Sequence, residues 1–351
     1  MIARFAPLFG AQALAVWVRA GGRPERSVRA YYPRLWWHAH LFEYNWRMQS
    51  SRMKSGSLLD DPVFIVGLWR SGTTVFHELF TTVTGWTTPQ TWQCFNPSTC
   101  FLTAPPSSDA TVDRPMDQGR ISNLGPQEDE FAVLLLGEPS IYRAFIDPRR
   151  LGECAAELWS TDGGAANKDA LPRWRDFLRG LNSPAAGTPL LLKSPTHTFR
   201  LSLLQELFPR ARFLWIGRRI GEVLNSNLRM WRAMVASHGL WACPDAVLDD
   251  FLREMVRACA GVLTRCLDDM PRERLLWIDF QELTANPTQV LQRVLRFLGV
   301  DEHGDSGSIA QRVDQALARI PIYDGSRSNL PTDEGAKQLE KLMAAARQRF
   351  G

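Results

Sequence analysis

Residues 62–80, PVFIVGLWRSGTTVFHELF, read as a buried strand, a tight turn and a helix in direct succession. The run Val63–Val66 is apolar with β-branched and aromatic side chains, which favours a parallel strand covered on both faces. Residues 67–74 supply glycines and hydroxyls where the chain turns into a helix. Such a turn directs backbone N–H groups and the positive end of the helix at one place, so it predicts an anion site.

The turn departs from the nucleotide-triphosphate loop at one informative position. Its glycine spacing almost fits G-x-x-x-x-G-K-[ST], but Thr73 stands where that motif has lysine. Arg70 lies inside the turn instead, and its planar guanidinium can hold an oxyanion through two hydrogen bonds. We therefore expect Arg70 and the N–H groups of Ser71, Gly72, Thr73 and Thr74 to bind an anion smaller than a magnesium triphosphate.

A second block, PLLLKSPTHTFRLSLLQELFPRARFLWIGRRIGEVLNSNLRMW, covers residues 189–231. Within it RFLWIG, residues 212–217, predicts a strand that is followed by Arg218. Ser226 comes eight residues later, about two helical turns, so it can face back toward the end of the strand. Open α/β sheets bind ligands at that end.

Together the two blocks resemble sulfotransferases that use 3′-phosphoadenosine 5′-phosphosulfate (PAPS). The similarity is to the form with an arginine in the loop, found in bacterial members and in tyrosylprotein sulfotransferases. It implies that residues 67–74 hold the 5′-phosphosulfate and that Arg218 and Ser226 hold the 3′-phosphate. Arg219-Ile220 departs from the Asp-Pro common in the family. The resemblance covers roughly residues 60–300.

The resemblance also implies a fold and a domain organisation. We expect a P-loop-like, three-layer α/β/α fold with a central parallel sheet, a helical N-terminal extension and a C-terminal cap. The expected parts are an aromatic-rich extension (1–60), a PAPS-binding domain (61–300) and a C-terminal loop and helix that close over the cofactor (301–351). Residues 85–125 are rich in proline, serine and threonine, so we expect an irregular stretch with short helices, which is usually a binding loop or lid.

The general base is sought among three consecutive carboxylates. Glu128, Asp129 and Glu130 start a helical pattern that runs from 126 to 145, where the helix dipole by itself accounts for acidic residues. Arginine-loop sulfotransferases often carry an acidic base in this region, so the resemblance favours Glu128. Which of the three faces the sulfate stays open, because one residue turns a helical side chain by roughly 100°.

Other side chains are candidates for the chemistry. Lys193 matches a lysine of the tyrosylprotein enzymes and would meet the developing charge on the leaving phosphate. His77 and His197 are the competing bases, because members with a lysine in the loop use histidine. His77 fits packing or capping better, and His197 could instead approach the acceptor. Arg327, in IYDGSRSNLP, is a further candidate for the 3′-phosphate, although arginine in such a loop is usually solvated.

The N-terminal region has several interpretations. It contains an unusual number of aromatic residues: Tyr31, Tyr32, Trp36, Trp37, Phe42, Tyr44 and Trp46. They could close over the acceptor site, form a dimer contact, contact a membrane surface or pack in a core. The stretch 5–18 is apolar but short and interrupted, which argues against a secretory signal, so we expect a cytoplasmic protein.

Composition sets the remaining limits. The 351 residues are 45% hydrophobic and 22% charged with a net charge of +4, too weak a basic excess to indicate nucleic acid. The six cysteines lack metal-ligand spacing, so we expect free thiols and no metal.

The resemblance implies the reaction. We expect sulfuryl transfer from PAPS to a hydroxyl, or less readily an amine, of a small molecule or lipid, leaving adenosine 3′,5′-bisphosphate (PAP). A P-loop kinase or NTPase and a non-catalytic nucleotide-binding module are the alternatives.

Overall fold

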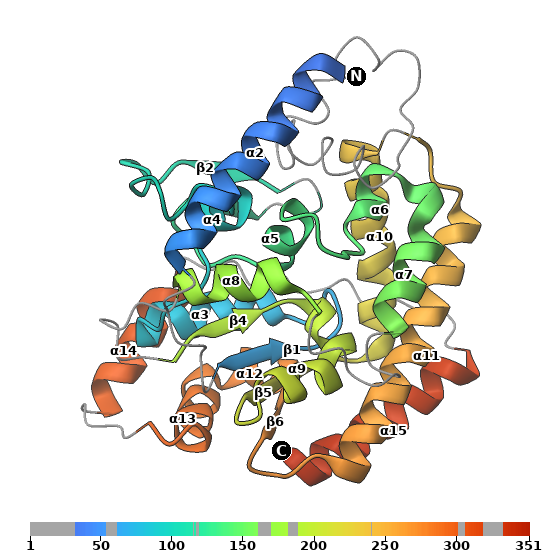
Figure 1. Cartoon of the computed structure of the whole chain (residues 1–351). Coiled ribbons are helices and arrows are strands. Elements are labelled where there is room, and N and C mark those ends of the chain that lie inside the picture. The colour runs from blue at the N-terminus through green and yellow to red at the C-terminus, as the bar shows by residue number, and fades with distance from the viewer. Residues whose placement is uncertain are drawn as a thin grey trace.

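A four-stranded parallel sheet with the order β4-β1-β5-β6 forms the centre of the computed structural model (Figure 1). Its strands are β1 (Val63–Val66), β4 (Leu191–Lys193), β5 (Arg212–Gly217) and β6 (Leu275–Asp279). The structure describes residues 32–53, 62–114, 116, 119–160, 170–181, 189–239, 241–300, 306–318 and 333–351. Because all four strands run the same way, the turns after β4, β1 and β5 emerge side by side at one edge.

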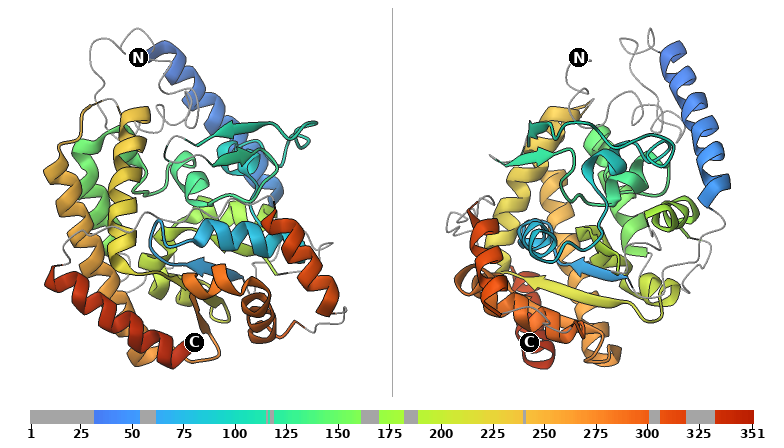
Figure 2. Two further views of the ribbon diagram at one scale, coloured as in Figure 1. Left: turned by 180° about the vertical axis from the view of Figure 1, so that it is seen from behind. Right: turned by 90° about the vertical axis from the view of Figure 1, so that its left-hand side faces the viewer.

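Helices cover both faces of this sheet, as the two further views show (Figure 2). Side chains alternate along each strand: in β1, Val63 and Ile65 face one core, whereas Phe64 and Val66 face the other. The Val63 face is covered by α3 (Thr73–Thr84), α12 (Phe280–Ala285), α13 (Pro287–Phe297) and α14 (Ser306–Leu317). The structure is therefore a three-layer α/β/α fold, as the sequence predicted.

The opposite face carries the larger core. The elements that cover it include α5 (Glu130–Leu135), α6 (Arg143–Ile146), α7 (Leu151–Ser160), α8 (Pro172–Leu181), η4 (Pro195–Arg200), α9 (Leu201–Leu207), α10 (Ile220–His238), α11 (Asp245–Asp269) and α15 (Glu334–Phe350). The short η3 (Pro148–Arg150) lies between α6 and α7. Helix α15 packs along α11 and against β6 (Figure 1). On α15, the Glu340 carboxylate accepts a 2.6 Å hydrogen bond from the Ile220 N–H, which ties the C-terminal helix to the start of α10.

The expected helix over 126–145 is divided in two. Helix α5 begins at Glu130, and α6 starts only at Arg143. Gly137 adopts a left-handed φ of 79° after α5, and Pro139 follows it two residues later, so the helix cannot continue. Glu128 and Asp129 consequently lie just before α5 rather than inside a first helical turn.

The segment 85–125 contains a predicted short helix and an antiparallel hairpin that its composition did not indicate. The helix is α4 (Thr91–Phe95), and the hairpin consists of β2 (Thr111–Asp113) and β3 (Arg120–Ser122). The segment is fastened to the N-terminal helix α2 (Tyr32–Met53) by Gln49, whose side chain donates to the Pro97 carbonyl at 2.6 Å and accepts from the Phe101 N–H at 2.8 Å.

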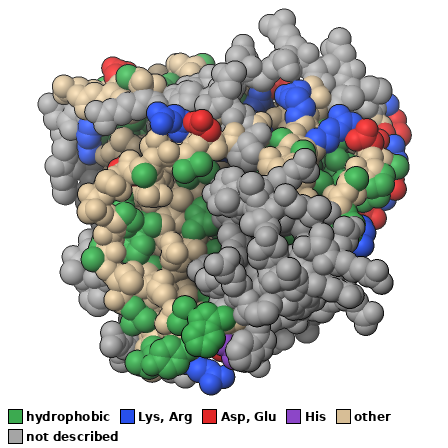
Figure 3. Space-filling view, turned by 90° about the horizontal axis from the view of Figure 1, so that it is seen from above, with side chains coloured by type: hydrophobic (Ala, Val, Ile, Leu, Met, Phe, Trp, Pro, Cys, Tyr) green, Lys and Arg blue, Asp and Glu red, His purple; other side chains and the backbone are tan. Residues whose placement is uncertain are grey.

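Helix α2 has two apolar stripes. Phe42, Trp46 and Met53 are buried against the larger core, whereas Trp37, Leu41, Tyr44 and Met48 are exposed. The view from above shows hydrophobic side chains gathered at one edge of the molecule, beside a histidine and a basic side chain (Figure 3). None of the helices among the described residues is long and apolar enough to cross a membrane.

Candidate active site

The turn between β1 and α3 has a backbone that most side chains could not adopt. Gly67, Arg70 and Gly72 have φ values of 140°, 70° and 104°. A Cβ atom at Gly72 would lie 2.1 Å from the Phe280 ring, so this position requires glycine for space as well as conformation. Arg70 occupies the left-handed region without that freedom, a strain of order 1–3 kcal/mol that proteins retain mainly at functional sites.

The turn also leaves polar groups available for an anion. Gly72 caps the N-terminus of α3 without a side chain, so no side-chain oxygen from the cap occupies the first helical N–H groups. The Ser71 hydroxyl is 2% exposed and has no hydrogen-bond partner among the described residues. A buried hydroxyl of this kind normally has a partner, so its position fits a loop that accommodates a phosphate or sulfonate.

Arg218 and Ser226 lie beside this turn, as predicted from their spacing. The Arg70 Nε donates to the Ser226 Oγ at 2.9 Å, although the residues are 156 positions apart. Arg218, directly after β5, donates from Nη1 to the Arg70 carbonyl at 3.4 Å and places its guanidinium 4.5 Å from the centre of the Phe280 ring. Its Nε donates to Glu222 at 2.8 Å, which fixes the guanidinium plane. Two arginines therefore converge at the ends of adjacent strands.

The three consecutive carboxylates have three different environments. Asp129 is fully buried and accepts hydrogen bonds from Trp174 Nε1 at 2.7 Å and from His197 at 3.0 Å. Glu130 is also fully buried, where it receives a bidentate hydrogen bond from Arg200. Both are thus satisfied inside the core.

Glu128 instead faces the turn. Its Oε1 lies 2.9 Å from Lys193 Nζ, and its side chain is 15% exposed. Lys193, the last residue of β4, is 2% exposed and also reaches Thr74 Oγ1 at 3.4 Å. The acid, the lysine and the loop hydroxyl therefore form one cluster, in which Lys193 connects Glu128 to the anion turn.

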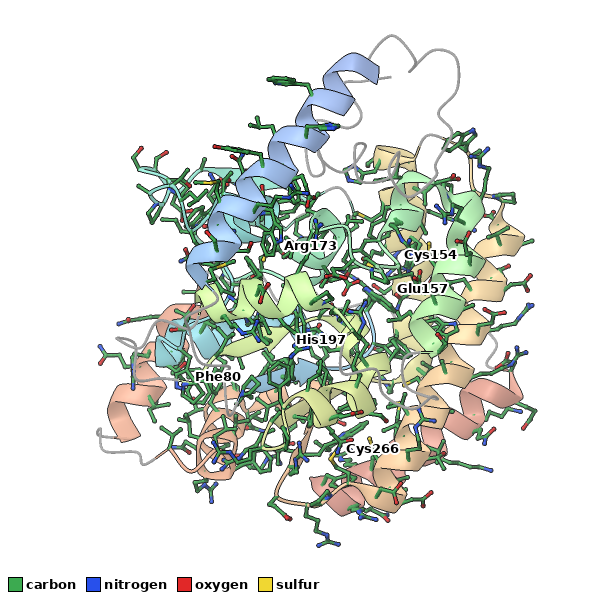
Figure 4. All side chains as sticks on the ribbon, viewed as in Figure 1. Phe80, Cys154, Glu157, Arg173, His197 and Cys266 are labelled. Atoms are coloured by element: carbon green, nitrogen blue, oxygen red, sulfur yellow. The ribbon has the colours of Figure 1, made fainter. Side chains whose placement is uncertain are left out.

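The two histidines are both buried in the interior. His77 Nε2 is hydrogen-bonded to Thr88 at 2.7 Å, and burial together with the nearby Lys193 charge lowers the pKa of His77 well below its usual value. His197 is fully buried and held by Asp129 (Figure 4). A general base needs access to the acceptor hydroxyl, and these positions favour packing roles for both histidines.

Two site residues were not singled out from the sequence. Tyr142 donates a 2.5 Å hydrogen bond to Glu128 Oε2, and Trp69 of the turn donates to the Tyr142 hydroxyl at 3.0 Å. Both lie in apolar runs typical of core residues, so spacing carried no signal for them. Arg327, the remaining candidate, lies outside the described residues, and its role stays a prediction.

A sequence model described as the sulfotransferase family matches residues 62–304, which is most of the chain. The chain belongs to the sulfotransferase family. It is 30% identical over 297 residues to the omega-hydroxy-beta-dihydromenaquinone-9 sulfotransferase Stf3 of Mycobacterium bovis and of Mycobacterium tuberculosis, covering 81% of this chain and 74% of each relative. The predicted family and enzyme class are thus confirmed.

Solved sulfotransferases share the fold. The crystal structure of STF9 from Mycobacterium avium superposes with a TM-score of 0.61 at 17% identity, covering 99% of this sulfotransferase and 87% of that chain. STF1 from Mycobacterium tuberculosis H37Rv gives the same TM-score at 15% identity, with 95% and 91% covered. None of the six cysteines, all of which lie among the described residues, takes part in a disulfide.

Proposed function

We propose that this sulfotransferase moves the sulfuryl group from PAPS to a hydroxyl of a lipid or small-molecule acceptor, with Glu128 as the general base. The observation that carries the proposal is the cluster in which Lys193 Nζ lies 2.9 Å from Glu128 and 3.4 Å from Thr74 of the anion turn. The cluster supports the proposal because Glu128 would then be the proton acceptor, and Lys193 the cation, beside the turn proposed to bind the transferring group. In-line transfer requires this combination of positioning and charge.

The donor site is assigned to two groups of residues. Arg70 and the turn residues Ser71, Gly72, Thr73 and Thr74 would hold the 5′-phosphosulfate, for which the buried Ser71 hydroxyl supplies a ready hydrogen bond. Arg218 and Ser226 would hold the 3′-phosphate, which distinguishes PAPS and its product PAP from ATP. Arg327 and the C-terminal segment 301–351 are proposed to close over the same nucleotide.

The proposed chemistry follows from the charges of these side chains. Glu128 takes the proton of the acceptor hydroxyl while the acceptor oxygen forms a bond to sulfur. The bond between sulfur and the bridging phosphate oxygen breaks, and Lys193 and Arg70 stabilise the negative charge that the departing phosphate gains. The products are a sulfate ester, PAP and a protonated Glu128, which returns the proton to solvent. The residues named require no metal ion, and we propose none.

The acceptor is proposed to be an apolar molecule with a free hydroxyl, since the curated relatives act on a hydroxylated menaquinone derivative. The segment 85–125, fastened to α2 through Gln49, is proposed to form the acceptor side of the site. An amine acceptor is the less favoured variant. We propose a cytoplasmic location, where PAPS is made, and no nucleic-acid partner.

The exposed stripe of α2 is proposed to contact the surface of a lipid bilayer that supplies such an acceptor. Trp37 and Tyr44 are 64% and 62% exposed, and aromatic side chains of this kind favour the membrane–water interface. Arg47, on the flank of the stripe, is also exposed and suits anionic headgroups. Association of the protein into an oligomer through this stripe is the alternative, which light scattering would reveal.

Calorimetric titration tests the donor assignment. We expect tight binding of PAP and weak binding of ATP with magnesium and of adenosine 5′-phosphate. Arg218→Ala should weaken PAP binding by about 10- to 100-fold, because a charged hydrogen bond contributes roughly 1.5–3 kcal/mol. Arg219→Ala is the matched control, because the neighbouring Arg219 side chain is 61% exposed and forms a salt bridge with Glu222.

Two other results would each support a different function. A preference for ATP with magnesium would replace the proposal with a kinase or NTPase. PAP binding without transfer to any hydroxylated acceptor, unaffected by loss of Glu128 and Lys193, would indicate a non-catalytic nucleotide-binding module.

A further inference from the structure

We propose that Tyr142 is a positioning residue for Glu128 and that Trp69, within the anion turn, fixes the direction of the Tyr142 hydroxyl. The inference rests on the proposed function of Glu128 as base and extends it to a hydrogen-bond chain that joins the donor loop to that base. The chain runs from Trp69 Nε1 to the Tyr142 hydroxyl at 3.0 Å and from this hydroxyl to Glu128 Oε2 at 2.5 Å.

The chemistry of the donors gives this chain one direction. An indole N–H can only donate, so the Tyr142 oxygen must accept from Trp69. The phenolic proton then points to Glu128 Oε2, which can only accept while it is ionised. Glu128 is therefore held at both oxygens, by Lys193 at Oε1 and by Tyr142 at Oε2. Two fixed donors leave the carboxylate one orientation relative to the turn.

The hydrogen-bond chain from Trp69 to Glu128 is buried and rigidly packed. Trp69 and Tyr142 are 3% and 2% exposed. The Tyr142 ring stacks on Phe145 at 4.8 Å between centroids, and Trp69 stacks on Phe199 at 5.9 Å. Neither ring can turn without displacing its neighbours, so the hydroxyl stays beside Glu128.

Trp69 also links this chain to the other half of the donor site. Its carbonyl accepts a 2.6 Å hydrogen bond from Asn227, the neighbour of Ser226 on α10. Trp69 itself immediately precedes Arg70. A shift of the turn on donor binding would therefore move Trp69, and through Tyr142 would reorient the base.

The charged and titratable groups around the chain agree with this role. Lys193 on β4 faces Glu128, and the buried Cys94, Asp129 and Glu130 lie close enough to interact electrostatically with members of the cluster. Burial and the Glu128 charge raise the pKa of Tyr142 well above its usual value. The phenol consequently keeps its proton and remains a donor across the working pH range.

Tyr142→Phe removes one hydroxyl and tests the chain directly. We expect kcat to fall about 10- to 100-fold, the effect of losing a hydrogen bond to a charged group, with the PAP dissociation constant unchanged. Thr264→Val, which likewise removes one hydroxyl but at an exposed position of α11, is the matched control and should change neither quantity.

A second readout needs no acceptor. In protein labelled with ¹³C at the glutamate carboxyl carbons, the Glu128→Gln spectrum identifies the Glu128 resonance. Its chemical shift should change in Tyr142→Phe, where Glu128 Oε2 loses its phenolic donor, and stay the same in Thr264→Val. An unchanged chemical shift in Tyr142→Phe would overturn the positioning role. Failure of the wild type to bind PAP would instead overturn the proposed function.

Trp69→Phe completes a double-mutant cycle. Alone it should lower kcat several-fold and move the Glu128 resonance in the same direction as Tyr142→Phe. In the Tyr142→Phe background it should have little further effect, because its N–H then has no phenolic oxygen to bind. Thermal melting identifies any loss of packing. Additive effects in a folded protein would overturn the part assigned to Trp69.

Discussion

Three consecutive carboxylates show that a shift of one residue along the chain changes a side chain's environment completely. In the core, Glu130 pairs with Arg200, and Asp129 pairs with His197. Of the three, Glu128 alone contacts Lys193 and Tyr142. A buried charge that lacks a partner is costly, so the two inner carboxylates are committed to their partners. Only Glu128 combines partial exposure with a position beside the anion turn.

Glu128→Gln should separate catalysis from binding. We expect kcat to fall by about 10²–10⁴, the usual contribution of a general base, with the PAP dissociation constant little changed. Glutamine keeps an oxygen that can accept from Lys193, so the fold should survive. The rate of sulfate-ester formation measures kcat, and calorimetry with PAP measures the dissociation constant.

Asp129→Asn provides the contrast for that variant. It should lower the melting temperature by weakening the contact with His197, while the folded enzyme keeps more of its kcat than Glu128→Gln does. A Glu128→Gln enzyme with wild-type turnover would show that another group accepts the proton.

At the scale of elements, the turn between β1 and α3 depends on its glycines. A Cβ at Gly72 would meet the Phe280 ring of α12, whose neighbouring face carries the Arg218 guanidinium. A side chain at this one position would thus displace both halves of the proposed donor site. Phe280 connects them because it follows β6 at the same edge of the sheet.

Gly72→Ala should weaken PAP binding at least tenfold, because the residue is held at a φ of 104° and the Phe280 ring must move. Gly152→Ala is the matched control: a Cβ there meets nothing within 4 Å, and alanine favours the helix α7. We expect Gly152→Ala to bind PAP normally and to be slightly more stable in urea. Equal PAP affinities in the two variants would remove the turn from the donor site.

Helix α2 is the element that tests the proposed lipid contact. Trp37→Ser combined with Tyr44→Ser should reduce co-sedimentation with phosphatidylglycerol-containing vesicles about tenfold or more, since each lost aromatic side chain removes apolar burial of order 1–3 kcal/mol. Asn45→Ser, between the two stripes, should have no effect. Unchanged vesicle binding would contradict the proposal. Light scattering that shows an oligomer abolished by the double substitution would assign the stripe to self-association.

At the scale of the whole molecule, buried histidines make stability depend on pH. Burial lowers the pKa of His238, at the end of α10, to about 4, and the pKa of His77 is lowered as well. The unfolded chain binds these protons near pH 6.5, so below that pH it holds more protons than the folded state. Stability is therefore present above pH 6.5 and is lost as the pH falls toward the folded pKa.

His238 alone should account for about 2 kcal/mol of the stability lost between pH 7 and pH 5, from linkage between the two pKa values. Urea unfolding at both pH values measures this difference. His238→Gln should reduce the loss by roughly that amount. His40→Gln, at an exposed position on α2, should leave it unchanged. A wild-type stability that is equal at the two pH values would contradict the assignment.

The strands β1 and β5 and the turn after β1 were predictable from the sequence because they depend on local patterns. Val63–Val66 and Arg212–Gly217 were predicted as strands and have those bounds, and Ser226 lies beside Arg70 as its two-turn spacing from Arg218 required. Short-range periodicity and glycine spacing encode these features directly.

Other features could not be predicted in this way. The sequence indicated irregular chain where β2 and β3 form a hairpin. It indicated one helix where α5 and α6 are separate. Tyr142 and Trp69 resembled core residues because hydrophobic patterning does not reveal which polar atom of a buried ring finds a partner.

The sequence by itself determined the sulfotransferase family, the parallel sheet and the anion turn, from which the proposed donor site is drawn, since each follows from neighbours close along the chain. Only the tertiary structure decided that Glu128, rather than Asp129 or Glu130, meets Lys193, and that Trp69 reaches Glu128 through Tyr142. The physical reason is that these contacts join residues 14 to 73 positions apart, and their geometry depends on where each helix starts and how it packs.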